Sequence, residues 1–390
     1  MRWLAAVLPG SLALLLLLLP LEARAGPEGT PPPADVASGP ALSADAAILI
    51  DGRTARTLWA RGADQGRAPA STTKMMTALV ALRRGQPDEQ VVVGAAAAAT
   101  PGSSAGLHAG DRYTLGALLR ALLLRSGNDA AVAIAIHIAG SVGAFAALMN
   151  AQAAALGLQN THFVNPHGLT APFHFSSARD LALIARAGLQ VPAFAALVDS
   201  TEAEIQGSDR LQREIRRELH NTNRLLLAYD WVDGVKTGTT TAAGNCLVAS
   251  GTRNGFRLIA VVLHSDDRWG DALRLLQWGY AHFSNVPVAL PGPGAIGLPV
   301  LAAWDVRQRV TVAAGEAPSV PVALDELPRV ALRIVTPTAL EAPIRRGQRV
   351  GSLQLQVAGT VLGAVPLLAS APVPRAPGWL LLWRRLTSGR

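Results

Sequence analysis

Residues 114–140, TLGALLRALLLRSGNDAAVAIAIHIAG, form a strongly apolar helical pattern that is interrupted at Ser126-Gly127-Asn128. A helix that is apolar on almost every side has to be buried, so the chain needs a core that can enclose it. Its 390 residues suffice for two domains with such a core, and 50% of them are hydrophobic. We therefore expect a folded protein rather than a disordered chain.

Helices and strands are both expected around this stretch. AAILIDGRTARTLWARGAD alternates like a β-hairpin with its turn at Asp51-Gly52, and residues 232–265 predict two or three further strands. Helical patterns cover 72–82, 144–156, 179–189 and 266–283. Helices grouped beside an antiparallel sheet predict an α+β domain over residues 43–284.

The sequence changes in character toward its C-terminus. Residues 288–371 contain short apolar or alternating runs that prolines and glycines separate, and they predict a small all-β domain. The tail, residues 376–390, includes GWLLLWRRLTSGR, in which tryptophans bracket leucines and arginines follow. This run is too short to cross a bilayer. It favours a segment that lies in the membrane interface, although a docked or frayed tail would share the pattern.

The N-terminus has the pattern of a secretory signal peptide. Residues 1–25 carry a basic tip, an apolar run and a small-x-small ending at Ala23-Arg24-Ala25. Because the apolar run is shorter than the roughly 20 residues of a membrane span, we expect cleavage and export rather than an uncleaved anchor. Residues 26–42 are rich in proline and glycine and predict a flexible leader.

Charge and cysteine content exclude some classes of function. The net charge of +8 would favour acidic polymers or anionic lipid, but no clustered basic face with interleaved aromatics predicts a nucleic-acid partner. The single cysteine, Cys246, lies in an apolar segment and is expected to be a buried, unreactive thiol. His162, His167 and His174 fit no standard zinc spacing, so no metal is expected.

Only two of the 35 basic side chains are lysines, Lys74 in PASTTKMMTALV and Lys236 in GVKTGTT. Arginine keeps its charge, whereas a buried lysine can lose its proton and act as a base. Ser71 lies one helical turn before Lys74, where a neutral lysine could activate the serine hydroxyl as a nucleophile. Burial and a second cation favour the neutral form, and Lys236 could supply that charge. Gly238 would let a substrate backbone approach closely.

Three short motifs follow one another along the chain, each at a predicted break in secondary structure. They are Ser-x-x-Lys at 71–74, Ser-Gly-Asn at 126–128 and Lys-Thr-Gly at 236–238. Each motif is weak alone, but the ordered set is typical of class A β-lactamases and penicillin-binding proteins, which have aspartate where this chain has Gly127. GSSAG at 102–106 also matches a nucleophile elbow, but the proline and glycines around it favour a loop.

With these motifs the sequence resembles the low-molecular-mass penicillin-binding D-alanyl-D-alanine carboxypeptidases. The resemblance extends from about Ala46 to the tail. It implies a penicillin-binding/β-lactamase-like serine peptidase domain, with a five-stranded antiparallel sheet between helices, and a β-sandwich-like second domain. It also rests on LLLRSGNDAAVAIA, LGLQNTHFVNPHGL, SARDLALIA, VDGVKTGTTTAAGNCLVAS, RWGDALRLLQWGY and APIRRGQRVGSLQLQV.

The resemblance implies a role for each candidate residue. Ser71 would attack the carbonyl of the penultimate D-alanine and form an acyl-enzyme, and Lys74 would take its proton. Ser126 would relay a proton to the leaving amine. Neither a cofactor nor a metal is required. The substrate-binding candidates are Asn128, Lys236, Thr237, Gly238, Thr239 and Arg268, with the backbone N–H groups of Ser71 and Thr239 as the oxyanion hole.

The expected substrate is the peptidoglycan stem pentapeptide, and β-lactams should acylate Ser71. The expected location is the periplasm, on the outer face of the cytoplasmic membrane. A class A β-lactamase would need a glutamate-bound water, but Glu202, Glu204, Glu214 and Glu218 have no convincing motif setting. A D,D-endopeptidase would share all three motifs. A non-catalytic peptidoglycan-binding protein would have little reason to keep both lysines.

Overall fold

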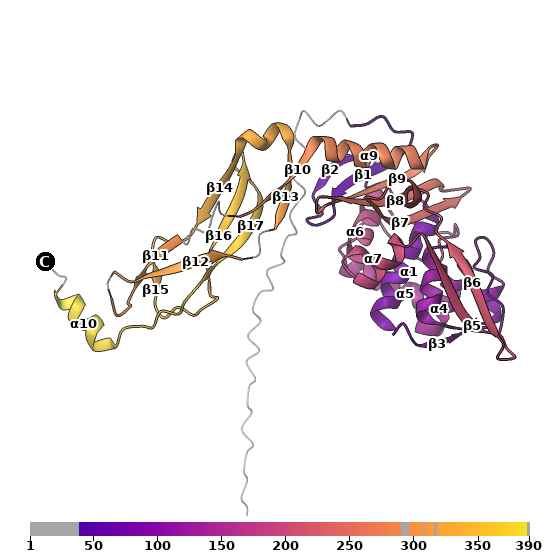
Figure 1. The fold of residues 1–390 in the computed structure, drawn as a ribbon, viewed down its shortest axis with the longest axis horizontal. Coiled ribbons are helices and arrows are strands. Elements are labelled where there is room, and N and C mark those ends of the chain that lie inside the picture. The colour runs from indigo at the N-terminus through magenta and orange to yellow at the C-terminus, as the bar shows by residue number, and fades with distance from the viewer. Residues whose placement is uncertain (1–38, 290–295, 306, 316–317, 388–390) are drawn as a thin grey trace, which may run out of the picture. The chain divides into compact units, whose positions relative to one another are not determined.

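The structure, a computed structural model, describes residues 39–289, 296–305, 307–315 and 318–387. The predicted signal peptide and most of the predicted leader lie outside these residues. Within them the predicted α+β architecture is confirmed, because a group of helices surrounds one antiparallel sheet and a β-rich region follows (Figure 1).

The first region is built on a five-stranded antiparallel sheet in the order β2-β1-β9-β8-β7. The predicted hairpin at Asp51 is confirmed, and the tight turn between β8 and β9 lies at Asn254-Gly255. The strands are β1 (Ala46–Asp51), β2 (Thr57–Arg61), β7 (Val232–Thr240), β8 (Gly244–Arg253) and β9 (Phe256–Ser265).

Both faces of this sheet carry apolar side chains. Successive side chains of a strand point to opposite sides, so a continuous apolar run contributes to both faces. In β9, Ile259 and Val261 join the core that the sheet shares with the helical group. Their neighbours Leu258 and Ala260 join the core beneath α9 (Arg268–His282) on the other face (Figure 1). The sheet is therefore enclosed between helices.

The apolar stretch 114–140 is buried in the helical group as predicted, and it divides into α3 (Leu115–Leu123) and α4 (Asn128–Ala139). No single described helix is long and apolar enough to cross a membrane; two pairs that would suffice together are bent by 85° and 108° between their helices. The other helices are η2 (Ala70–Thr73), α1 (Lys74–Arg84), α2 (Ala95–Ala98), α5 (Val142–Ala155), α6 (Ala178–Leu189), α7 (Pro192–Asp199) and α8 (Leu225–Ala228).

A second, four-stranded sheet in the order β3-β4-β5-β6 was not predicted. Its largest part is a hairpin from the polar stretch that carries the four glutamates. In that hairpin Ile205 and Leu219 are buried while the glutamates are exposed, so one apolar face suffices to hold a largely charged strand pair. The strands are β3 (Gln90–Val92), β4 (Arg112–Thr114), β5 (Glu202–Ser208) and β6 (Glu214–His220).

The start of the described chain is attached to α9 through Asp271, whose side chain is fully buried. Its carboxylate accepts hydrogen bonds from Ser43 Oγ at 2.7 Å, Ala44 N at 2.9 Å, Ser265 Oγ at 2.7 Å and Arg274 Nη2 at 2.6 Å. Burial raises the pKa of this carboxyl, but the hydrogen bonds outweigh burial and bring the pKa down to about 2.

The C-terminal region is β-rich, as predicted, with its own apolar core that includes Val312 and Leu353. The helix α10 (Gly378–Thr387) follows it. Two sheets occur here, in the orders β10-β13 and β14-β16-β17-β12-β11-β15. The strands are β10 (Phe283–Pro287), β11 (Ile296–Leu301), β12 (Arg309–Ala314), β13 (Ser319–Ala323), β14 (Val330–Val335), β15 (Leu340–Glu341), β16 (Arg349–Val357) and β17 (Thr360–Ala369).

Candidate active site

Ser71 lies in the short helix η2, which ends directly before α1 begins at Lys74. The preceding residue, Ala70, has a positive φ of 48°, a conformation that non-glycine residues adopt at some energetic cost and often at functional sites. Gly168 fixes this turn from outside, because a Cβ there would stand 1.8 Å from Ala70 O. A glycine is therefore required at position 168.

The ammonium group of Lys74 is fully buried and touches three oxygen atoms. Its Nζ lies 2.9 Å from Ser71 Oγ, 2.7 Å from Asn128 Oδ1 and 2.7 Å from the carbonyl oxygen of His167. The Asn128 amide is oriented by its Nδ2 group, which donates to Pro101 O at 2.6 Å. Asn128 Oδ1 and His167 O can only accept hydrogen bonds.

These partners define what a neutral Lys74 can do. A neutral amine has two N–H bonds and one lone pair. The two N–H bonds are required by Asn128 Oδ1 and His167 O, so the lone pair faces the Ser71 hydroxyl. The arrangement is thus suited to removing the hydroxyl proton of Ser71.

The environment favours that neutral form. Burial and the positive charge of Lys236 hold the pKa of Lys74 well below its ordinary value of 10.5, against an opposing effect of Asp129. Lys236 is itself buried, and burial followed by the charge of Arg268 lowers the pKa of Lys236 to about 7. The expectation from the sequence that burial and the charge of Lys236 favour a neutral Lys74 thus agrees with the structure.

The Ser-Gly-Asn motif links α3 to α4. Ser126 is 5% exposed and has a positive φ of 61°, and Asn128 N donates to Ser103 O at 2.7 Å. The next residue, Asp129, holds the facing loop: its carboxylate accepts from Ser104 Oγ at 2.5 Å and Ala105 N at 3.0 Å. GSSAG is therefore a loop, as expected, and Asp129 attaches it to the motif.

The Lys-Thr-Gly motif lies in β7 and faces η2. A Cβ at Gly238 would stand 3.1 Å from Ser71 N and 3.1 Å from Ala70 Cβ, so a glycine allows the close approach of strand and helix. Thr237 Oγ1 lies 2.7 Å from Thr222 Oγ1 and is 3.5 Å from Lys236 Nζ.

Arg268, the first residue of α9, reaches the same strand from the other side. Its Nη1 donates to Gly238 O at 3.0 Å and to Thr239 Oγ1 at 2.7 Å. The guanidinium therefore fixes the end of β7 at which the predicted oxyanion donor, the N–H of Thr239, is located.

The structure brings most of the predicted site residues together. Ser71, Lys74 and Asn128 are hydrogen-bonded, and Gly238 approaches Ser71. Among the described residues no hydrogen bond joins the hydroxyl of Ser126 to either lysine; Ser126 lies two residues before Asn128, which contacts Lys74. The sequence motifs assigned no role in the site to the His167 carbonyl, Thr222 or Asp129. Each of them acts through a contact with a residue at least 15 positions away, which only the folded chain creates.

Two other predictions concern chemistry outside the motifs. Cys246 is fully buried, and burial raises the pKa of its thiol, so it is the unreactive cysteine that was expected. His174 Nδ1 accepts from Val164 N at 3.1 Å, and its Nε2 lies 3.0 Å from Thr73 Oγ1. Burial and the charge of His162 lower the pKa of His174 to about 4, so this histidine is neutral. The described residues contain no group of three metal-ligating side chains.

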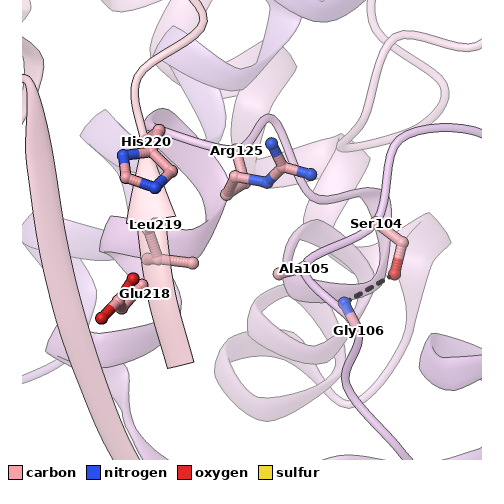
Figure 2. A pocket seen from close by; sticks show the side chains of 7 residues that line it. All are labelled: Ser104, Ala105, Gly106, Arg125, Glu218, Leu219 and His220. Carbon is pink, nitrogen blue, oxygen red and sulfur yellow. Dashed lines mark hydrogen bonds between the residues drawn. The ribbon is translucent and has the colours of Figure 1, made fainter. Parts of the chain in front are cut away.

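A pocket of about 480 Å³ adjoins the Ser-Gly-Asn motif. Figure 2 shows the residues that line it: a loop on one side, the end of β6 on the other, and Arg125 between them. The lining residues are Ser104, Ala105, Gly106, Arg125, Glu218, Leu219 and His220.

Comparison with known proteins agrees with this geometry. Residues 34–267 match the family described as D-alanyl-D-alanine carboxypeptidase, and residues 303–375 match the C-terminal domain of penicillin-binding protein 5. The chain is 36% identical to the D-alanyl-D-alanine carboxypeptidase DacC of Escherichia coli (strain K12) over 361 residues, 88% of each protein. It is 32% identical to DacF of Bacillus subtilis (strain 168) over 360 residues, 88% of this chain and 89% of that protein.

A solved structure has a similar fold. The penicillin binding protein 5 of Haemophilus influenzae superposes with a TM-score of 0.71 at 30% identity, covering 87% of this chain and 99% of that protein. With a serine hydroxyl 2.9 Å from a buried lysine and its three ordered motifs, the chain belongs to the penicillin-binding D-alanyl-D-alanine carboxypeptidase family of serine peptidases.

Proposed function

We propose that this protein removes the terminal D-alanine from peptidoglycan stem pentapeptides through an acyl-enzyme on Ser71. The observation that carries the proposal is the coordination of Lys74 Nζ. Two obligate acceptors occupy its N–H bonds, and its lone pair is directed at Ser71 Oγ, 2.9 Å away. Such a serine–base pair is the basis of nucleophilic catalysis.

Acylation begins when Ser71 Oγ attacks the carbonyl carbon of the penultimate D-alanine and Lys74 takes the hydroxyl proton. The backbone N–H groups of Ser71 and Thr239 stabilise the resulting oxyanion, a contribution of roughly 3–4 kcal/mol for a single donor in other hydrolases. Gly238 supports this arrangement because it lets β7 approach η2 at Ser71 N.

The leaving group departs on the side of Ser126. The amide bond to the terminal D-alanine breaks, and its nitrogen receives a proton from Lys74 through the Ser126 hydroxyl. Lys236 and Thr237 bind the terminal carboxylate of the substrate. Arg268 holds the strand in place. Water then attacks the ester on Ser71 and releases the shortened peptide. β-Lactams should form the same ester.

The test is mass spectrometry of a pentapeptide that ends in D-Ala-D-Ala, incubated with residues 26–390. We expect the loss of one alanine with the parent protein and none with Ser71→Ala. Fluorescent penicillin should label only the parent. An unchanged peptide, with a protein that still binds penicillin, would contradict the carboxypeptidase proposal; equal cleavage by Ser71→Ala would contradict the assigned nucleophile.

We further propose that the protein is exported to the periplasm and attaches to the membrane surface through α10. Four apolar side chains of this helix, Trp379, Leu382, Trp383 and Leu386, are each at least 59% exposed. Their spacing of three and four residues puts them on one face. A short apolar face with nearby arginines suits the membrane interface.

This second proposal is tested by sedimentation of residues 26–390 with vesicles that contain anionic lipid. We expect the protein to sediment with the vesicles and a chain that ends at residue 375 to remain in solution while keeping its peptidase activity. A Trp379→Glu/Trp383→Glu double variant is the matched control, because it disrupts the apolar face without shortening the chain. Equal binding by all three chains would overturn the proposed anchor.

A further inference from the structure

The pocket in Figure 2 lies between two segments that both lead into the active site. Arg125 directly precedes Ser126. On the opposite wall, Glu218–His220 end β6 two residues before Thr222, which is hydrogen-bonded to Thr237 at 2.7 Å. The pocket therefore adjoins the Ser126 and Thr237 side of the site.

This is the side on which the leaving group is held in the proposed mechanism. Ser126 delivers the proton to the leaving amine, and Thr237 binds the carboxylate on the same residue. A volume of about 480 Å³ falls within the range of small-ligand sites. The side chain of D-alanine is a single methyl group, so the pocket has room for a much longer side chain on the leaving residue.

The charge of the pocket indicates which side chain it would take. Arg125 is exposed, and within the described part of the chain it makes no ion pair. Glu218 points away from Arg125 in Figure 2. His220 has a carboxylate near it already, with Glu202 Oε2 at 3.9 Å from Nδ1. The Ser104 hydroxyl is engaged with Asp129. The guanidinium of Arg125 is therefore available to bind an anion.

We propose that this pocket is a subsite for the side chain of the leaving D-amino acid, in which Arg125 selects a side chain that ends in a carboxylate. The inference rests on the proposed function, because the acyl-enzyme on Ser71 and the proton transfer to the leaving amine are unchanged. Two substrates share this chemistry: a linear stem that ends in an acidic D-residue, and a crosslinked stem whose leaving D-centre carries a second, carboxylate-ended peptide.

The experiment uses residues 26–390 and four peptides with one acyl part and different leaving residues: D-alanine, D-norleucine, D-2-aminoadipate and D-lysine. We expect kcat/KM for D-2-aminoadipate to exceed that for D-lysine by about fivefold or more, the effect of a well-placed solvent-accessible ion pair. Arg125→Ala should abolish this preference, and Arg125→Glu should reverse it. Arg120→Ala, which removes an exposed arginine of α3 outside the pocket, should keep it.

The ratio between peptides separates this proposal from the proposed function. If no peptide is cleaved, the carboxypeptidase assignment fails. If D-Ala-D-Ala is cleaved but the two charged leaving residues react equally, or if Arg125→Ala lowers kcat/KM for all four peptides by one factor, the subsite proposal is wrong. A crosslinked peptide dimer identifies the source: cleavage that Arg125→Ala weakens indicates crosslinks, and resistance of the dimer indicates linear acidic stems.

Discussion

Replacing Gly238 with alanine should impair acylation more than it impairs folding. The added Cβ would lie 3.1 Å from each of three atoms: Ser71 N, Ala70 Cβ and Pro69 O. Carbon atoms in contact normally stand about 3.5–4.0 Å apart. The strand β7 and the helix η2 would therefore have to separate by a few tenths of an ångström.

The size of the effect follows from what is displaced. Overpacking of this kind costs about 1–3 kcal/mol, which should lower Tm by roughly 2–12 °C in a domain of this size. One of the three atoms, Ser71 N, belongs to the oxyanion hole, and loss of one such donor costs about 10²–10³-fold in kcat. Because the donor moves but stays present, we expect the acylation rate to fall by about 10–100-fold.

The assay is stopped-flow acylation by a fluorescent penicillin, with Tm measured on the same samples. The control is Gly143→Ala in α5, where a Cβ meets no atom within 4 Å. That change should raise stability by about 0.5–1 kcal/mol and leave acylation unaltered. If Gly238→Ala acylates at the parent rate, the contact between β7 and η2 does not position the oxyanion donor, and the reasoning is refuted.

Three further predictions concern titratable groups. Acylation should increase with pH as Lys74 loses its proton and decrease above about pH 7, where buried Lys236 loses the charge that binds substrate; Lys236→Arg keeps the charge, so its rate profile should lack the alkaline decrease. Asp271→Asn should lower the free energy of unfolding by about 2 kcal/mol at pH 7. Because the native pKa of Asp271 is depressed to about 2, urea titrations of the two proteins should converge as the pH falls from 4 toward 2, and a constant difference would contradict this. His174→Leu leaves the buried Thr73 hydroxyl without its partner and should cost about 2 kcal/mol in the same titrations, whereas an unchanged midpoint would show that water replaces the imidazole.

The sequence was sufficient to predict the helices and strands whose apolar pattern is strong. The continuous apolar runs of β9 and of α3 and α4 reflect burial directly, so they predicted their elements. The β5–β6 hairpin was missed because only one of its faces is buried and its exposed face carries the charges. Local sequence does not reveal that Ile205 and Leu219 face a core.

For the active site, the side chains were easier to predict than the backbone groups. Because the chain contains only two lysines, Lys74 and Lys236 could be selected as candidates from the sequence alone. The carbonyl of His167 contacts Lys74 from 93 positions along the chain, and every residue has a carbonyl, so no side-chain motif could identify it. The asparagine–proline–glycine turn around it, at 165–168, is the one local signal that a special backbone conformation was present.

The attachment of the GSSAG loop to Asp129 bears on how such an enzyme can change during evolution. Asp129 is fully buried, and it connects the motif that carries Asn128 to a wall of the neighbouring pocket. Substituting it would disturb chemistry and pocket together. The rim residues Arg125 and His220 are exposed and make no contact with Lys74. New substrate preferences can therefore arise at the rim by single substitutions, while the reaction itself is preserved.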